Sequence, residues 1–203
     1  TGVGTGTYMT YGITTGNPAA ADVITGTSTA TCILTSGTPD FTGIIWQGQC
    51  QNQDFSSAGT VVTFSGKTVS TTTYMHLTTA SVASFRDHAT ASTNPLRIDS
   101  TKGATITSTG GAAGTVAGGG TGLRISNLQI RATGVGSRAL TMTGTSQIME
   151  NCILEGTLTA APTTNATLLF GNGASCTVRN TVVRQRASAA DHIISTQTAT
   201  VAF

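Results

Sequence analysis

Three residues of this sequence have side chains suited to acid–base chemistry on a glycan: Asp54, Asp87 and His88. They lie in segments 47–60 and 86–94, which are predicted loops at the corner of neighbouring structural repeats. A glycosidase needs two carboxyl groups about 5–10 Å apart, and a lyase needs a base with a cation or an arginine. Alternatively, both aspartates form turns and the histidine is simply exposed. We favour this second interpretation.

Four other charged residues share one position in an alignment of repeated segments, and their signs alternate: Asp99, Arg131, Glu155 and Arg184. Charges on neighbouring strands attract one another as cross-strand pairs do. Glu150 similarly falls beside Arg179. Both glutamates are therefore predicted to be structural ladder partners rather than catalytic groups.

The cysteines do not form a metal-binding motif. Cys32, Cys50, Cys152 and Cys176 show no CxxC spacing and no nearby histidine pattern, so we expect no metal and no cofactor. Cys152 and Cys176 fall on different predicted strands and should not bridge. Buried free thiols are the favoured state. Cys32 and Cys50 are not assigned.

A recurring asparagine defines the elements that position these side chains. Segments 124–133, 147–156 and 176–185 align on Asn127, Asn151 and Asn180. The apolar residues two places before the asparagine are Ile125, Met149 and Val178, and those three places after it are Ile130, Leu154 and Val183. Asparagine tolerates the left-handed backbone conformation, so it can turn the chain sharply between two strands. Equivalent asparagines would stack as a hydrogen-bonded ladder.

A third apolar segment follows each corner, at 139–142, 167–170 and 192–195. Three strands per repeat predict an all-β fold, a single-stranded parallel β-helix of about five coils, with the right-handed winding usual for parallel crossovers. The high Thr content and 25 Gly fit this class. We predict an N-terminal arm or cap over residues 1–30 and the β-helix over 31–203.

The earlier coils are assigned by the same pattern. Segments 44–46 and 84–86 match the strand before the corner, and 61–64 and 95–99 match the strand after it, with Pro95 in place of the asparagine. Segments 31–34, 74–77 and 103–107 match the third strand. At the other end, residues 198–203 resemble one more strand before a corner.

Composition excludes two classes of partner. Charged residues make up 9% of the chain and the net charge is +2, too little for an electrostatic nucleic-acid binder. The apolar runs are too short to cross a membrane.

Segments 84–110, 124–133, 137–140 and 151–156 resemble a β-helix family encoded by tailed phages and prophages. The resemblance covers about residues 44–186 and implies a virion structural protein with no established catalytic residues. It therefore predicts a virion protein assembled in the host cytoplasm, favoured as a capsid decoration (cement) protein without catalytic activity.

The expected partners are the major capsid protein or other virion proteins, and further copies of the chain, with a trimer favoured. Outward positions after the corner become apolar at Ile153 and Val182, which predicts a partner-contact face there. One alternative is a tail fibre or tailspike module that binds or cleaves host surface polysaccharide. A secreted adhesin or lyase is disfavoured because no signal segment is seen.

Overall fold

The computed structural model describes residues 23–25, 31–33, 45–64, 74–88, 96–110, 114–134, 137–156, 166–185 and 192–203. The chain divides into two units, residues 1–42 and 43–203. In the first unit, β1 (Val23–Thr25) pairs antiparallel with β2 (Thr31–Ile33). Segment 31–34 therefore does not join the third strand class, and the division falls later in the chain than the boundary predicted at residue 31.

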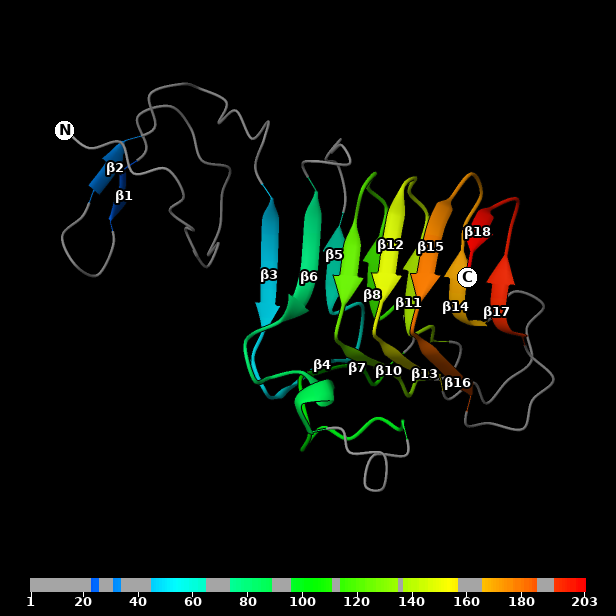
Figure 1. The fold of residues 1–203 in the computed structure, drawn as a ribbon, viewed down its shortest axis with the longest axis horizontal. Helices are drawn as coiled ribbons and strands as arrows, with labels where there is room; N and C mark the ends of the chain where they lie inside the picture. Colours follow the sequence, from blue (N-terminus) through cyan, green and yellow to red (C-terminus); the bar gives the residue numbers. More distant parts are fainter. Residues whose placement is uncertain are drawn as a thin grey trace. The chain divides into compact units, whose positions relative to one another are not determined.

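The second unit is a parallel β-solenoid built from three sheets, with three strands per coil (Figure 1). The strands before the corner form the pre-corner sheet, which has six strands: β3 (Trp46–Cys50), β6 (Met75–Thr79), β9 (Arg124–Ser126), β12 (Gln147–Glu150), β15 (Ser175–Arg179) and β18 (Thr200–Ala202). The strands after the corner form the five-stranded post-corner sheet: β4 (Asp54–Ser57), β7 (Thr105–Ser108), β10 (Gln129–Ala132), β13 (Ile153–Gly156) and β16 (Val182–Gln185). The third sheet has five strands: β5 (Val62–Phe64), β8 (Val116–Gly118), β11 (Leu140–Met142), β14 (Ala166–Phe170) and β17 (His192–Thr196).

Every strand neighbour in these three sheets is one coil away in the sequence. This pattern confirms the predicted parallel solenoid with three strands per coil. The strand expected near the C-terminus is present as β18, which pairs with β15 in the pre-corner sheet. In Figure 1 the post-corner sheet forms the lower side of the solenoid.

The core lies between the three sheets and consists of apolar columns, each with one residue per coil. The register aligns Ile125, Met149 and Val178 in the pre-corner sheet, Ile130, Leu154 and Val183 in the post-corner sheet, and Leu140, Leu168 and Ile194 in the third sheet. Strand side chains alternate in direction, so the residues on either side of each column point away from the core. The columns account for the buried core cluster.

The corner asparagines adopt the backbone conformation that the sequence predicts. Asn127, Asn151 and Asn180 have φ of 62°, 54° and 45°, in the left-handed region. Asn180 Nδ2 donates to Asn151 Oδ1 at 3.4 Å, whereas Asn127 Nδ2 donates to Ser126 Oγ at 3.4 Å. A side-chain contact between corners is therefore present between the last two of these asparagines.

The corner of the preceding coil is formed by a glycine. Thr105 is in register with Gln129, so Gly103 occupies the position of Asn127. Gly103 has φ of 114°, and a Cβ there would meet the backbone nitrogen of Phe85 at 2.4 Å. One coil earlier the equivalent residue is Asn52, whose Oδ1 accepts a hydrogen bond from Gly103 N at 3.0 Å. Only glycine fits the corner at 103, both by conformation and by space.

Several early segments are assigned to the wrong sheet by the sequence pattern. Segment 61–64 is β5 of the third sheet, 74–77 belongs to β6 of the pre-corner sheet, and 103–107 leads into β7 of the post-corner sheet. Segment 84–86 is not a strand, because the 3₁₀ helix η1 spans Phe85–His88. Segment 95–99 is not a strand where it is described. Segment 44–46 does lead into a pre-corner strand, β3.

The cause of these misassignments is an insertion between β6 and β7, residues 80–104, which the structure describes at 80–88 and 96–104. It leaves the stack at the corner and returns to it at Ala104, whose backbone N–H donates to Ala83 O at 2.8 Å. The described parts lie over the outer face of the post-corner sheet, so residues of that sheet that point away from the core are buried. Thr105, Gln129 and Ile153 all have no exposed surface.

Candidate functional site

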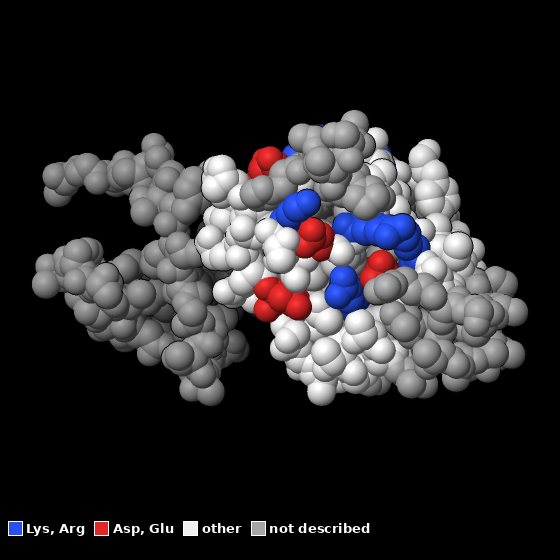
Figure 2. Space-filling view, turned by 90° about the horizontal axis from the view of Figure 1, so that it is seen from below, with Lys and Arg blue, Asp and Glu red and all other residues white. Residues whose placement is uncertain are grey.

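The candidate functional site is a groove on the outer face of the post-corner sheet, where several charged side chains line one hollow. Its volume is about 430 Å³, and its lining consists of Arg97, Ile98, Arg131, Glu155, Arg184 and Gln185. The first two residues come from the insertion and the others from β10, β13 and β16. Figure 2 shows basic and acidic side chains gathered on this face of the solenoid. We call it the arginine groove.

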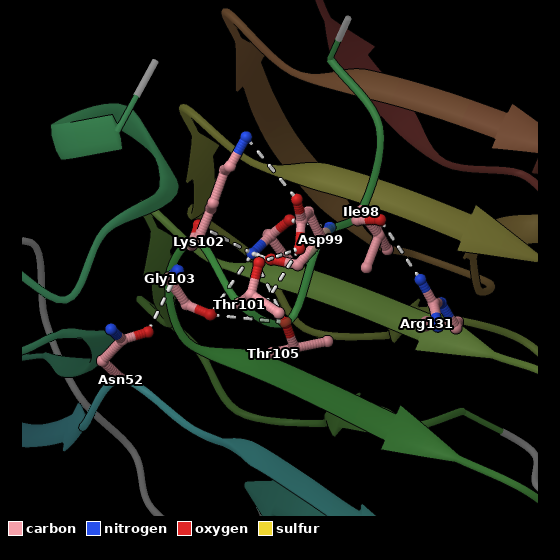
Figure 3. A network of polar contacts seen from close by, with 9 residues as sticks. Asn52, Ile98, Asp99, Thr101, Lys102, Gly103, Thr105 and Arg131 are labelled. Atoms are coloured by element: carbon pink, nitrogen blue, oxygen red, sulfur yellow. Dashed lines mark hydrogen bonds and ion pairs between the residues drawn. The ribbon is translucent and has the colours of Figure 1, made fainter. Parts of the chain in front are cut away.

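The charges in the groove are positioned by strand register. Arg131 is opposite Glu155, and Glu155 is opposite Arg184, so each carboxylate or guanidinium projects from the same place on successive coils. Arg131 Nε lies 3.3 Å from Glu155 Oε1, and Arg131 Nη2 donates to Ile98 O at 3.3 Å (Figure 3). The Glu155 side chain is only 4% exposed. Glu155 is thus part of a charge ladder, as predicted for it.

Asp99 is not a member of this ladder, contrary to the prediction. The residue in register with Arg131 on the preceding coil is Thr107. Asp99 instead lies in a turn of the insertion, where Oδ1 accepts hydrogen bonds from Thr101 N at 3.0 Å and Thr101 Oγ1 at 2.6 Å (Figure 3). These bonds, together with the charges of Lys102 and Arg131, lower the pKa of the Asp99 carboxyl. Lys102 Nζ lies 3.8 Å from Asp99 Oδ2.

A buried glutamine holds that turn against the sheet. Gln129 Oε1 accepts a hydrogen bond from Asp99 N at 2.8 Å, and Nε2 donates to Asp99 O at 3.0 Å. Nε2 also lies within reach of Lys102 O, Gly103 O and Thr105 Oγ1. Since Gln129 is fully buried, its amide satisfies backbone groups of the insertion that the sheet itself leaves without a partner. The turn and the groove wall at Ile98 are thereby fixed in place.

The predicted partner-contact face at Ile153 and Val182 is wrong for Ile153. Ile153 points away from the core, but it is fully buried in a small cluster with Phe85 and Ile98 of the insertion. Val182 is half-buried. The apolar residue that the sequence assigns to an external partner is covered by the chain itself.

The three candidate glycan residues have individual structural surroundings. Asp54 Oδ1 accepts a hydrogen bond from Thr107 Oγ1 at 2.8 Å on the outer face of the post-corner sheet. Asp87 Oδ2 accepts from Ser84 N at 3.0 Å, while Ser84 Oγ accepts from Arg86 N at 3.1 Å. Both side chains therefore satisfy backbone N–H groups at the start of η1, as capping side chains do. His88 ends η1, and its side chain lies outside the described residues.

Sequence reasoning missed a polar cluster on the outer face of the pre-corner sheet. His76 Nε2 lies 2.8 Å from Ser126 Oγ, which also lies 3.0 Å from Thr78 Oγ1. The guanidinium carbon of Arg124 sits 3.6 Å from the centre of the Tyr74 ring. A histidine–serine contact is the geometry of a base and its nucleophile. Ser126, however, is buried at 3% exposure, so the contact packs two strands together rather than presenting a nucleophile to substrate.

Burial pushes the pKa of His76 below its usual value, and the positive charge of Arg124 adds to that shift, while Glu150 opposes it. Glu150 is in register with Arg179, as predicted. The cluster could have been found from the alternation of side chains along β6 and β9, which places His76 and Thr78 on the same outer face as Arg124 and Ser126. That inference requires segment 74–77 to be assigned to the pre-corner sheet.

The cysteines are thiols at all three described positions. Cys50, Cys152 and Cys176 are free and buried, which confirms the prediction for the last two. Burial raises the pKa of Cys50 to about 11 and that of Cys152 and Cys176 to about 12. The side chain of Cys32 lies outside the described residues. In the described part of the chain, no group of three or more His, Cys, Asp or Glu side chains is placed to hold a metal ion.

Comparison with known proteins finds no matching family model, no matching curated protein and no matching solved structure. Among the residues that the structure describes, no helix is long and apolar enough to cross a membrane.

Proposed function

We propose that the chain is a non-catalytic structural protein of a phage virion, and specifically a capsid decoration protein. We infer a non-catalytic role because the candidate carboxylates are hydrogen-bonded or ion-paired to neighbouring protein groups. Asp87 caps η1, Asp54 accepts from Thr107, and Glu155 is held against Arg131. Each group stabilises the scaffold on which it stands. The assignment to a virion rests on the resemblance of segments 84–110 and 124–133 to phage-encoded β-helices.

The solenoid is well suited to this role. Each coil binds the next through a continuous ladder of main-chain hydrogen bonds in three sheets, so the scaffold is stiff along its axis. Only 9% of residues are charged, so the stability of the solenoid should depend little on salt concentration. The major capsid protein and further copies of this chain are the proposed partners.

The test begins with particles of the phage or prophage that encodes the chain. Mass spectrometry should find the protein in purified virions, and gold-labelled antibody should mark the head. Label on the tail, or absence of the protein from the particles, would overturn the assignment. In parallel, incubation with host surface polysaccharide should release neither reducing ends nor unsaturated sugars. Release of either would show that the chain is an enzyme.

A further inference from the structure

The arginine groove has a chemistry that the structural role does not use. Three arginines line it against one lining carboxylate, that of Glu155. Asp99 lies close by, but its carboxylate is already bound by Thr101 and faced by Lys102. The groove therefore carries an excess of positive charge, which attracts anions.

Four side-chain atoms of the lining are buried and make no hydrogen bond of ordinary geometry among the described residues. Two of them, Arg131 Nε and Glu155 Oε1, face each other as an ion pair at 3.3 Å, which leaves the donors Arg184 Nη1 and Gln185 Nε2. A buried donor without a partner destabilises the folded state, so native structures rarely leave one without a reason. Both donors are neighbours at the end of β16. Side chains of consecutive strand residues alternate in direction, and Arg184, in register with Glu155, is the one on the outer face of the sheet, where an oxyanion would supply the acceptor that Nη1 lacks.

The remaining arginines are arranged differently. Arg131 is fixed by Glu155 on one side and by Ile98 O on the other, so its guanidinium is held in a defined orientation before any ligand arrives. Arg97 is exposed at the rim. A held guanidinium and an exposed one thus belong to the same lining, and arginine binds planar or tetrahedral oxyanions through paired N–H groups.

We propose that the arginine groove binds a small organic oxyanion, either a carboxylate or a phosphate ester. The volume of about 430 Å³ falls in the range of small-molecule sites, about 300–1,000 Å³, and is larger than a bare anion needs. The shared chemistry is a carboxylate or phosphate on a molecule small enough for the groove, and sugar acids and sugar phosphates serve as its probes. This inference does not depend on the virion assignment.

Isothermal titration of the full chain at low salt tests the proposal, with glucuronate, glucose 6-phosphate, inorganic phosphate and neutral glucose as probes. Saturable binding of glucuronate or glucose 6-phosphate, weaker for phosphate and not detectable for glucose, is expected. The stronger of the two sugar probes identifies the anion. Binding of inorganic phosphate alone would overturn the proposal. So would the absence of saturation by any probe at ligand concentrations up to about 20 mM, well above the millimolar Kd of a weak complex.

Variants connect binding to the groove. Arg184→Gln removes one charged donor and should weaken binding about tenfold or more. Arg97→Gln changes an exposed residue outside the strands and should weaken binding with the fold intact. Arg179→Gln is the matched control, because Arg179 is an exposed arginine on β15 of the pre-corner sheet and its loss changes the net charge equally. Equal weakening in the control and the groove variants, or no weakening in Arg97→Gln, would refute the site.

Discussion

Replacing the corner asparagines by alanine should destabilise the solenoid, whereas replacing them by glycine should not. Asn127, Asn151 and Asn180 all have positive φ. The left-handed conformation costs an ordinary L-residue roughly 1–2 kcal/mol, and asparagine less, so each alanine should cost about 1 kcal/mol. Glycine adopts the conformation freely but loses about 0.5–1 kcal/mol in chain entropy, which leaves it close to neutral.

The three corners lie on successive coils, and Asn180 contacts Asn151 through a side-chain hydrogen bond of 3.4 Å. Because residues in contact are not strictly additive, the triple alanine variant should lose roughly 2–4 kcal/mol rather than the exact sum of the single losses. Equilibrium urea unfolding followed by both circular dichroism and fluorescence measures this. With a slope of about 1–3 kcal/mol per M, each alanine shifts the midpoint by roughly 0.5 M. Equal midpoints for the alanine and glycine series would refute the role assigned to these corners.

Three further predictions concern the stability of the core cluster, the pH dependence of stability and the reactivity of the thiols. Ile153→Ala should lower the free energy of unfolding by about 2–4 kcal/mol, as for a buried side chain; a surface-like loss below about 0.5 kcal/mol would contradict the cluster that covers it. The free energy of unfolding should fall as pH drops below about 6.5, the pKa of an unfolded histidine. The folded state lowers the pKa of His76 and therefore binds the proton less readily than the unfolded chain. His76→Gln should flatten this pH dependence, and an unchanged profile in the variant would contradict the role of His76. The thiols of Cys50, Cys152 and Cys176 should resist a thiol reagent at pH 8 until the chain is unfolded, since burial raises the pKa of all three; rapid labelling of the native protein at any of them would disprove their burial.

The late coils could be predicted from the sequence because each carries its own corner signal. Asn127 and its two successors stand at fixed distances from apolar residues on both sides, which sets the register of the pre-corner and post-corner strands. The structure has those pairings, including Arg131 with Glu155 and Glu155 with Arg184. Where a local conformational requirement and a hydrophobic pattern coincide, sequence alone specifies the coil.

The early coils could not be predicted because their corner signal is different. Gly103 performs the turn that asparagine performs later, and a glycine in a chain with 25 of them attracts no notice. The insertion at 80–104 also separates β6 from β7, so strands that adjoin in space are distant in sequence. The same insertion buries Ile153, an effect that no periodicity within β13 contains. The arginine groove likewise needs Arg97 from one segment and Arg184 from another.

The detour at 80–104 begins and ends beside a single corner, and the coils above and below keep their register. Lengthening such a loop is inexpensive, since each doubling costs only about 0.6 kcal/mol. The surface of the molecule can thus be changed here while the coils beneath keep their pairing. For the same reason, a peptide epitope grafted between residues 88 and 96 should be displayed on a scaffold that folds as before. The graft leaves Gly103 and the hydrogen bonds of Gln129 to Asp99 unchanged.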